Sequence, residues 1–353
     1  MSTTNPSTPD PDQSALYCTN CGGQCHYAPT RHALECLSCG EKFDLSQPDD
    51  NRAAEEFPHD PDAPQADPPV LNTSDTHQCR NCGGEVIFTG PALSEACPYC
   101  NGPMVLHSGD AGYATMALIP FRIDKKHAQK QAAAWVASRT AAPTNLSANV
   151  GRADMAGLYA PFWTFDSQEA VQYWAKYTTG SGDNRRTHST TGRMNITFDD
   201  MLMPASPHVT PLIRDGILHE FDPYDLKPYR AGYLSGFAAE RHHQSVAQGL
   251  VANMPDKNLL IRNKIKRKIN KRGVHAIRYN TDTTGIHYRR ILLPVWMLHY
   301  QYSGKAYKVV VSGIDGRTFG ERPFSMLKML AYSSALTAAA LVFGLMWGAA
   351  GLL

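Results

Sequence analysis

The order of apolar and polar positions along the chain predicts strands in its middle part. Four runs have the aromatic and β-branched content of strands, namely residues 116–123, 158–166, 170–179 and 193–200. Residues 179–184 are rich in glycine and polar side chains and predict a hairpin loop. From residue 274 to residue 320 the pattern is again typical of strands.

Helical spacing is found between these strands. Asp124 precedes an amphipathic stretch and predicts a capped helix over residues 125–138. The apolar side chains that share one side of this helix are Ala128, Ala132, Trp135 and Val136. A second helix is expected over residues 210–220, and a long helical stretch ends near Lys271, with an interruption expected at Pro255. Because strands, helices and strands follow without regular βαβ alternation, the predicted fold class is α+β.

We expect these elements to form an α+β domain over residues 112–325, either undivided or with two subdomains that meet near residue 236. Pro120, Pro161 and Pro294 lie in apolar strand-like runs. A proline cannot donate to a strand ladder, so each is expected at a sheet edge or a β-bulge.

The C-terminal residues 329–353 contain no charged side chain. As a helix this segment is about 37 Å long, against a hydrocarbon core of ~30 Å, and it predicts one transmembrane helix. Basic residues precede the span and none follows it, so the positive-inside rule places the bulk of the chain in the cytoplasm. Three glycines of the span are spaced for close helix packing and suggest a homo-oligomer or another membrane partner: Gly344, Gly348 and Gly351.

Eight of the nine cysteines fall in four CxxC pairs. The members are Cys18, Cys21, Cys36, Cys39, Cys79, Cys82, Cys97 and Cys100. The second four repeat the first four at an offset of 61 positions, which indicates a duplicated unit over residues 17–45 and 77–106. No signal-peptide pattern is present at the N-terminus, so metal binding is favoured over disulfides.

Two CxxC pairs that are 14 residues apart bring four thiolates to one point, as in a zinc ribbon. Four cysteine ligands leave no position open for water, so we expect two structural Zn²⁺ ions, with iron or a redox dithiol as the alternatives. Cys25 corresponds to Val86 in the second unit and is expected to be an inert strand residue.

Residues 46–76 separate the two ribbons and contain eight acidic residues, one arginine and six prolines. This composition predicts an extended linker, and an ordered wrap around the second ribbon is the alternative. Residues 1–16 are expected to be disordered.

Residues 257–278 carry nine basic residues and no acidic one, although the net charge of the chain is only +2. Ile261, Ile265 and Ile269 form a narrow apolar stripe on this predicted helix. Three interpretations stay open: a solvated helix docked by its isoleucines, contact with anionic lipid headgroups, or contact with nucleic acid. The candidate contact residues are Arg262, Lys264, Lys266, Arg267, Lys268, Lys271 and Arg272. The ribbons themselves carry few basic residues, which disfavours nucleic-acid binding by them.

No enzyme signature is recognisable, since GxxxxGK[ST], HExxH and GxSxG are all absent. We therefore expect no catalytic residues and no enzymatic activity, with an unrecognised site in residues 112–325 as the alternative. His242 and His243 are expected at the surface.

Several segments occur in an order that resembles a known family: CRNCGG, CPYCNGP, ALIPFRI, LYAPFWTFD and the block PVWMLHYQYSGKAYKVVVSGIDGRTFGERP at residues 294–323. They are similar to a bacterial family of membrane-anchored double zinc-ribbon proteins, often labelled TFIIB-type zinc-ribbon or primosomal protein N′ (replication-restart helicase)-like. The resemblance covers residues 77–353 well and the first ribbon more loosely. The helicase label does not fit, because the chain has no Walker A motif and no helicase core.

The family resemblance implies a non-enzymatic membrane scaffold in bacteria. With the apolar C-terminus and the charge pattern, the expectation is a tail-anchored, single-pass protein of the bacterial inner (plasma) membrane, with its N-terminal bulk in the cytoplasm. The resemblance implies protein partners of the SPFH (flotillin-like) and phage-shock-type membrane-stress classes. This chain reads VSGIDGRTF where the family usually has VNGQTGKV, so a partner contact at residues 311–319 is in question. The alternative function is a membrane-tethered nucleic-acid-binding zinc-ribbon protein with a role in replication or transcription.

Overall fold

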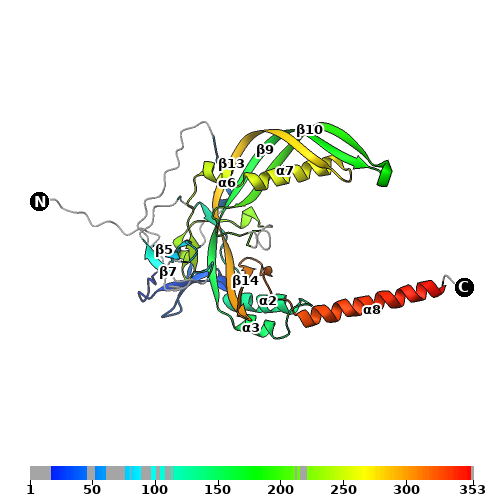
Figure 1. Cartoon of the computed structure of the whole chain (residues 1–353). Helices are drawn as coiled ribbons and strands as arrows, with labels where there is room; N and C mark the ends of the chain where they lie inside the picture. Colours follow the sequence, from blue (N-terminus) through cyan, green and yellow to red (C-terminus); the bar gives the residue numbers. More distant parts are fainter. Residues whose placement is uncertain are drawn as a thin grey trace.

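The computed structural model describes residues 17–45, 52–60, 76–79, 81–88, 97–100, 104–107, 113, 115–210, 213–214 and 221–350. Within these ranges the chain has the predicted α+β fold. Its strands form one three-stranded sheet and one large sheet of twelve strands (Figure 1). The segment 1–16, predicted to be disordered, lies outside the described residues.

Two long antiparallel strands, β9 (Met155–Thr179) and β13 (His275–Tyr302), form the centre of the large sheet. Their pairing runs from His275 opposite Lys176 to Leu298 opposite Met155. The sequence predicts two separate strands, 158–166 and 170–179, where the structure has the single strand β9, so this subdivision is wrong. The polar residues that interrupt each apolar run are accommodated by shifts of register, one of them between Thr284 and His287, instead of by turns.

Pro161 and Pro294 lie inside these two central strands without breaking them. The carbonyl of Pro161 accepts from Ala205 N–H at 3.1 Å, and that of Pro294 accepts from Gly313 N–H at 2.9 Å. Both carbonyls therefore point away from the β9–β13 ladder. Because a residue's N–H and C=O point to the same side in an antiparallel strand, neither missing N–H is needed by that ladder.

Shorter strands flank this pair. The order across the large sheet is β11-β8-β13-β9-β12-β6-β5-β7, with β10 on β9, β14 and β4 on β13, and β15 on β14. The bounds are β4 (Phe57–Pro58), β5 (Thr76–Cys79), β6 (Glu85–Phe88), β7 (Met104–His107), β8 (Ala117–Leu118), β10 (Arg186–Pro204), β11 (Lys227–Pro228), β12 (Ala238–Glu240), β14 (Lys305–Ser312) and β15 (Thr318–Gly320). The small sheet contains β1 (Cys25–Ala28), β2 (Ala33–Cys36) and β3 (Lys42–Asp44).

Helices α2 (Lys125–Ala137) and α3 (Leu146–Arg152) pack together beside β14 and β15. The carboxylate of Asp124 accepts from His127 N–H at 2.7 Å, which is the predicted cap. Of the helix expected over residues 210–220, only Ile213 and Arg214 are described beyond Thr210, and both are helical. Short helical turns occur at η1 (Pro29–Arg31), η3 (Gly182–Asn184), η4 (Pro223–Asp225) and α5 (Ala231–Leu234).

The long helical stretch is two helices, α6 (Val246–Ala252) and α7 (Met254–Ile269). The sequence predicts the break at Pro255, but it falls at Asn253. Pro255 lies in the first turn of α7, where a missing N–H leaves no intrahelical bond unmade.

Beyond the register shifts, the large sheet extends as a curved arm (Figure 1). The rest of the two sheets, with the helices packed on them, is called the body. The arm consists of residues 167–198 and 254–284, which include the distal parts of β9, β10 and β13 together with α7. Its own apolar cluster contains Val171, Tyr173, Ala175, Ile196, Phe198, Ile261, Ile265 and Ile277. The predicted isoleucine stripe of the basic helix is therefore the face that packs on the strands.

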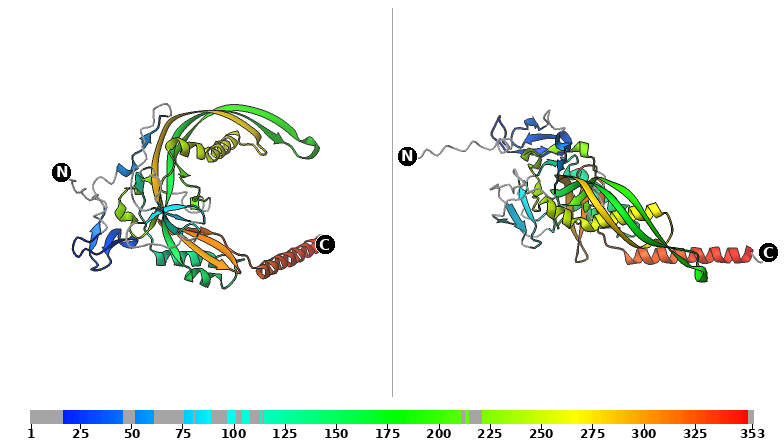
Figure 2. Two further views of the ribbon diagram at one scale, coloured as in Figure 1. Left: turned by 60° about the vertical axis from the view of Figure 1, so that its left-hand side comes forward. Right: turned by 90° about the horizontal axis from the view of Figure 1, so that it is seen from above.

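Helix α8 (Met326–Ala350) projects from the other end of the body. Residues Met326–Trp347 have a mean hydropathy of 1.7 and none of their apolar window is buried. This helix is long and apolar enough to cross a membrane. Figure 2 shows that α8 and the arm extend to the same side of the body.

Candidate metal centres

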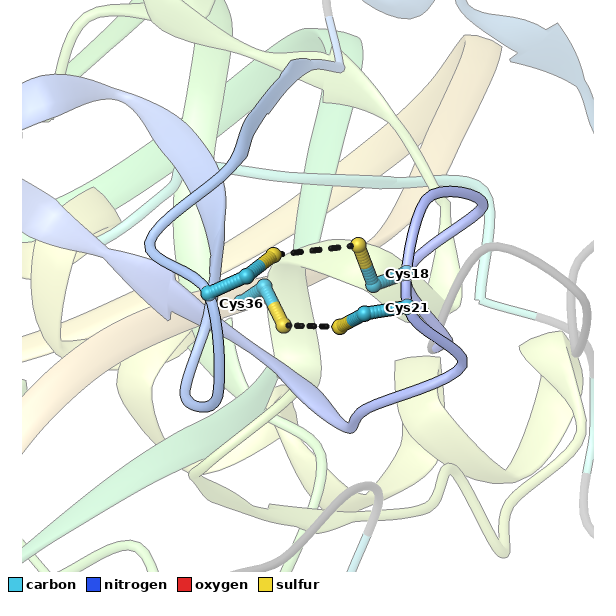
Figure 3. Close-up of side chains that lie close together, drawn as sticks. Cys18, Cys21 and Cys36 are labelled. Carbon is cyan, nitrogen blue, oxygen red and sulfur yellow. Dashed lines mark hydrogen bonds between the residues drawn. The ribbon is translucent and has the colours of Figure 1, made fainter.

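The structure gathers the eight predicted ligands into two groups of four cysteines. In the first group the Sγ atoms of Cys18 and Cys39 are 3.6 Å apart, and those of Cys21 and Cys36 are 3.5 Å apart. All four ligand atoms lie within 4.8 Å of one another. Figure 3 shows Cys18, Cys21 and Cys36 pointing toward a common centre from two separate turns.

The second group has the same arrangement. The Sγ atoms of Cys79 and Cys100 are 3.5 Å apart, and those of Cys82 and Cys97 are 3.7 Å apart. Its ligand atoms also lie within 4.8 Å of one another. The repeat of 61 positions is thus reproduced in three dimensions.

The first turn of each ribbon is fixed by equivalent backbone hydrogen bonds. Gly22 N–H donates to Cys18 C=O at 2.8 Å, and Gly83 N–H donates to Cys79 C=O at 2.9 Å. Both glycines have positive φ angles, +69° and +75°, which other residues rarely adopt. This turn directs both cysteines of a CxxC pair to the same side.

The sulfur distances fit a tetrahedral metal ion and exclude disulfides. With metal–sulfur bonds of ~2.3 Å, the edges of a tetrahedron are about 3.8 Å long. A disulfide requires ~2.05 Å. Ser38 N–H and Asn81 N–H each approach a cysteine sulfur at 3.4 Å, a contact that orients thiolate ligands. Each four-cysteine group can therefore hold one metal ion, with no ligand position left open.

One thiol in each group ionises near neutral pH. A hydrogen bond from the Cys39 backbone N–H lowers the pKa of Cys36 to about 6. Burial raises the pKa of Cys79, but the backbone N–H groups of Cys82 and Asn81 outweigh it and lower the pKa to about 7. The thiolate is the form that binds a metal cation.

The ninth cysteine does not join either group. Cys25 is fully buried in β1, and its counterpart Val86 is fully buried in β6. Burial raises the pKa of Cys25 to about 11. The thiol therefore stays neutral, as expected for a structural strand residue.

The first ribbon packs on the body through α5. Tyr27 N–H donates to Ser235 C=O at 3.0 Å, and Ser235 Oγ donates to Cys25 C=O at 2.6 Å. The rings of Tyr27 and Tyr233 meet edge to face at 5.4 Å. This ribbon keeps its own sheet and is held by contacts with the body.

The second ribbon is part of the large sheet. Its strand β6 pairs with β12, which also pairs with β9. Tyr99, between two ligands, donates its hydroxyl to the buried carboxyl of Glu240, and Ser206 Oγ donates to the same group at 2.5 Å. His299 Nε2 lies 2.9 Å from Pro98 C=O in the same turn. Hydrogen bonds and strand pairing thus connect the second four-cysteine group directly to the core.

Part of the acidic segment between the ribbons is bound to the body. Phe57 and Pro58 form β4 and pair with Tyr288 and His287 of β13. Ala54 C=O accepts from Arg289 Nη1 at 2.8 Å. Residues 52–60 therefore lie on the central strand rather than around the second ribbon.

Three carboxylates, those of Glu56, Asp166 and Asp200, have oxygens within 4.8 Å of one another. The guanidinium of Arg289, whose side chain is 3% exposed, lies 2.6 Å from Glu56 and also pairs with Asp200. Burial and a hydrogen bond with Asp166 raise the pKa of Glu56 to about 7. An arginine already supplies positive charge here, so this cluster fits a structural ion network at the base of the arm. No sequence motif marks these residues.

The candidate basic residues fall into two groups. Arg262 donates to Ile277 C=O at 2.9 Å, and the Lys264 ammonium lies 5.5 Å from the Phe198 ring, so both support the arm. The remaining five are exposed near the end of α7 and in the following loop: Lys266, Arg267, Lys268, Lys271 and Arg272.

Of the three glycines predicted to pack membrane helices, Gly344 has open space around it and Gly348 is helical. Gly351 lies outside the described residues. His242 is a correction to the sequence analysis, because it is fully buried and not at the surface. Its Nε2 lies 3.1 Å from Phe162 C=O and its Nδ1 lies 3.2 Å from Thr115 Oγ1.

Comparison with known proteins gives one relative of nearly the same length. The chain is similar to the uncharacterized protein YdjG of Bacillus subtilis (strain 168), with 25% identity over 346 residues. The alignment covers 90% of this chain and 93% of that protein. No family model matches the chain, and no solved structure matches it.

Proposed function

We propose that this protein is a membrane-anchored double zinc-ribbon scaffold that holds protein partners at the cytoplasmic face of a bacterial inner membrane. The observation that carries the proposal is the combination of two closed four-cysteine groups with an exposed apolar helix on one chain. The first feature supports a structural metal and the second supports an anchor.

Zinc is the metal that best suits both groups. Four soft thiolates in a tetrahedron favour Zn²⁺, and a metal ion stabilises a small ribbon that lacks a core of its own. Because all four ligands are protein sulfurs, the bound ion would hold turns together and would not activate water. This supports a non-enzymatic role for the ribbons.

Helix α8 would form the anchor. Its first turns are tied to the loop between α2 and α3, since Ser325 N–H donates to Ala141 C=O at 2.8 Å and Lys328 Nζ donates to Ala142 C=O at 2.7 Å. Lys328, Arg322 and Arg317 precede the apolar stretch, which supports a cytoplasmic location of the body. A body fixed at the membrane surface is suited to recruiting partners there.

The family resemblance suggests who those partners are. It points to membrane-stress proteins of the SPFH (flotillin-like) and phage-shock types. The test is affinity purification of the full chain from detergent-solubilised bacterial membranes, with and without nuclease, followed by mass spectrometry. The expected result is retention of such membrane proteins after nuclease treatment.

The matched control is the same chain without residues 326–353, which we expect in the soluble fraction. If partners disappear with nuclease and nucleic acid co-purifies, the scaffold proposal fails in favour of a tethered nucleic-acid-binding protein. If the truncated chain stays with the membrane, the assignment of α8 as the anchor fails.

A further inference from the structure

We propose that the distal end of the arm is a second membrane contact, which binds the anionic phospholipid headgroups of the bilayer that holds α8. This inference rests on the proposed function, because it takes α8 as the membrane anchor. It adds an interaction surface, a chemical class of ligand and a set of residues outside the basic helix.

The distal half of the arm carries ten exposed basic side chains: Lys176, Arg185, Arg186, Arg193, Lys266, Arg267, Lys268, Lys271, Arg272 and Arg278. The same two segments, residues 176–193 and 266–282, contain only Asp183 and Asp282 as acidic residues. Among the described residues, no carboxylate forms an ion pair with any of the ten. The positive charge is therefore available to an external anion.

Basic residues nearer the body are engaged differently. Lys257 pairs with the buried carboxylate of Glu169 at 2.5 Å, and Arg262 donates to a backbone carbonyl of β13. These two side chains hold the arm together. The contrast separates positive charge that stabilises the arm from positive charge that is exposed at its end.

The topology concentrates this charge at the tip. Lys176 is opposite His275 in the last pair of the β9–β13 ladder, so the hairpin that carries Arg185 and Arg186 extends beyond β13. The loop with Lys271 and Arg272 lies beside it, since a Cβ on Gly273 would be 3.8 Å from Thr178. Segments about 85 positions apart in the sequence thus meet at one end of the arm.

The direction of the arm matches the direction of α8. Figures 1 and 2 show both leaving the body on the same side, and the arm tip reaches beyond the first turns of α8 in each view. The contacts of Ser325, Lys328 and Tyr332 with the loop at residues 140–142 hold the start of α8 on the body. The arm tip therefore lies on the membrane side of the body, where it meets the headgroups of a bilayer that α8 crosses at a tilt.

An anionic bilayer surface suits this end of the arm. Basic side chains beside a negatively charged leaflet are attracted over about one Debye length, ~10 Å in 0.1 M salt. Anchoring by α8 would keep the arm at high local concentration near the lipid, so a weak contact is sufficient.

The test uses the full chain in nanodiscs of phosphatidylcholine alone or of phosphatidylcholine mixed with phosphatidylglycerol. Amide hydrogen exchange is measured over residues 176–190 and 264–280. We expect slower exchange in the anionic discs, reversed by raised salt. In the R185Q/R186Q/K271Q/R272Q variant this protection should be lost, because each basic residue near an anionic surface contributes about a fivefold change in binding.

The control variant R31Q/K42Q removes exposed basic residues of the first ribbon, on the opposite side of the body from the tip. It should keep the protection. A chain that does not co-elute with either disc would overturn the anchor. A chain that co-elutes but exchanges equally in both discs would overturn the arm contact alone. If an added oligonucleotide slows exchange at the tip more strongly, in phosphatidylcholine discs, than the anionic lipid does, the ligand of the arm is nucleic acid and the lipid proposal fails.

Discussion

The ammonium of Lys257, on α7, lies 2.5 Å from the carboxylate of Glu169, on β9. Glu169 is fully buried and also accepts from the hydroxyls of Thr281 and Thr283, each at 2.8 Å. Burial raises the pKa of Glu169, but the hydrogen bonds from Lys257 and the two threonines outweigh it and keep the pKa below its usual value. This one carboxylate therefore joins three parts of the arm: α7, β9 and β13.

Replacing Lys257 by methionine should loosen α7 on the arm. The substitution leaves Glu169 buried with only hydroxyl donors, and losing one partner of a buried pair costs roughly 3 kcal/mol. Hydrogen exchange of the α7 amides measures this directly. The double variant K257M/E169Q should recover most of the loss, whereas K266Q on the exposed face should change little. Equal protection in K257M and the wild type would show that the pair does not hold the helix.

Single ligand substitutions should each remove one metal ion. We expect two ions per wild-type chain, one in C39S, one in C100S and two in C25V, where valine is the residue of the second ribbon at the equivalent position. Metal analysis of the purified full chain gives the counts. Full occupancy in C39S or C100S would contradict the assignment of ligands.

Loss of the second metal should disturb the body more than loss of the first. Strand β6 pairs with β12 and β12 pairs with β9, whereas the first ribbon has a separate sheet. Hydrogen exchange over β12 and the start of β9 should accelerate in C97S and stay near wild type in C36S. The reverse order would mean that the sheet does not depend on its metal-bound edge.

Glu240 should make stability depend on pH. Burial raises the pKa of this carboxyl to about 7, above a usual value of 4.5. The stabilisation from this proton is complete below pH 4.5. It is lost as the pH rises through 7, where the folded protein releases the proton. The free energy of unfolding lost at higher pH is at most about 3 kcal/mol, since a difference of one in pKa corresponds to about 1.36 kcal/mol.

The variant E240Q tests this dependence, since its amide stays neutral and keeps an acceptor for Tyr99. The difference in denaturation midpoint between E240Q and wild type should increase from about pH 5 to about pH 8 in favour of E240Q. The same comparison with E55Q, at an exposed carboxylate that does not act on Glu240, serves as the control. If the difference in denaturation midpoint between E240Q and the wild type is constant with pH, Glu240 does not titrate in this range and the prediction is wrong.

Two helical glycines should respond to alanine with opposite signs. A Cβ on Gly249 of α6 would lie 2.8 Å from Trp163 Nε1, so G249A should destabilise by roughly 1–3 kcal/mol. At Gly151 of α3 the nearest atom would be the Cβ of Ala133 at 3.9 Å, and G151A should stabilise by up to ~1 kcal/mol. Thermal unfolding of both variants provides the measurement. Stabilisation by G249A would show that α6 is not packed on Trp163.

Local signals in the sequence were sufficient for the features that depend on local chemistry. The CxxC turns, the Asp124 cap, the isoleucine stripe and the apolar C-terminal helix each follow from residues within one or two turns of one another. The two four-cysteine groups could be assigned for the same reason, because a repeated spacing identifies them.

Features that depend on distant contacts could not be predicted in this way. Nothing near His242 indicates that Phe162 C=O and Thr115 lie beside it in the core. Arg185 and Arg186 form a charged end with Lys271 and Arg272 only because β9 and β13 pair along their whole length. Arg289, similarly, receives its partners from segments 89 and 233 positions away.

Strand β9 extends for 25 residues, about 80 Å of contour, from beside the second ribbon to the tip hairpin. Tension applied at the tip is consequently transmitted to the body along covalent backbone, without a flexible joint in that strand. The same load reaches the metal-bound edge of the sheet through the β9–β12 and β12–β6 hydrogen bonds. A pull at the tip would therefore load these short ladders along the direction of their strands.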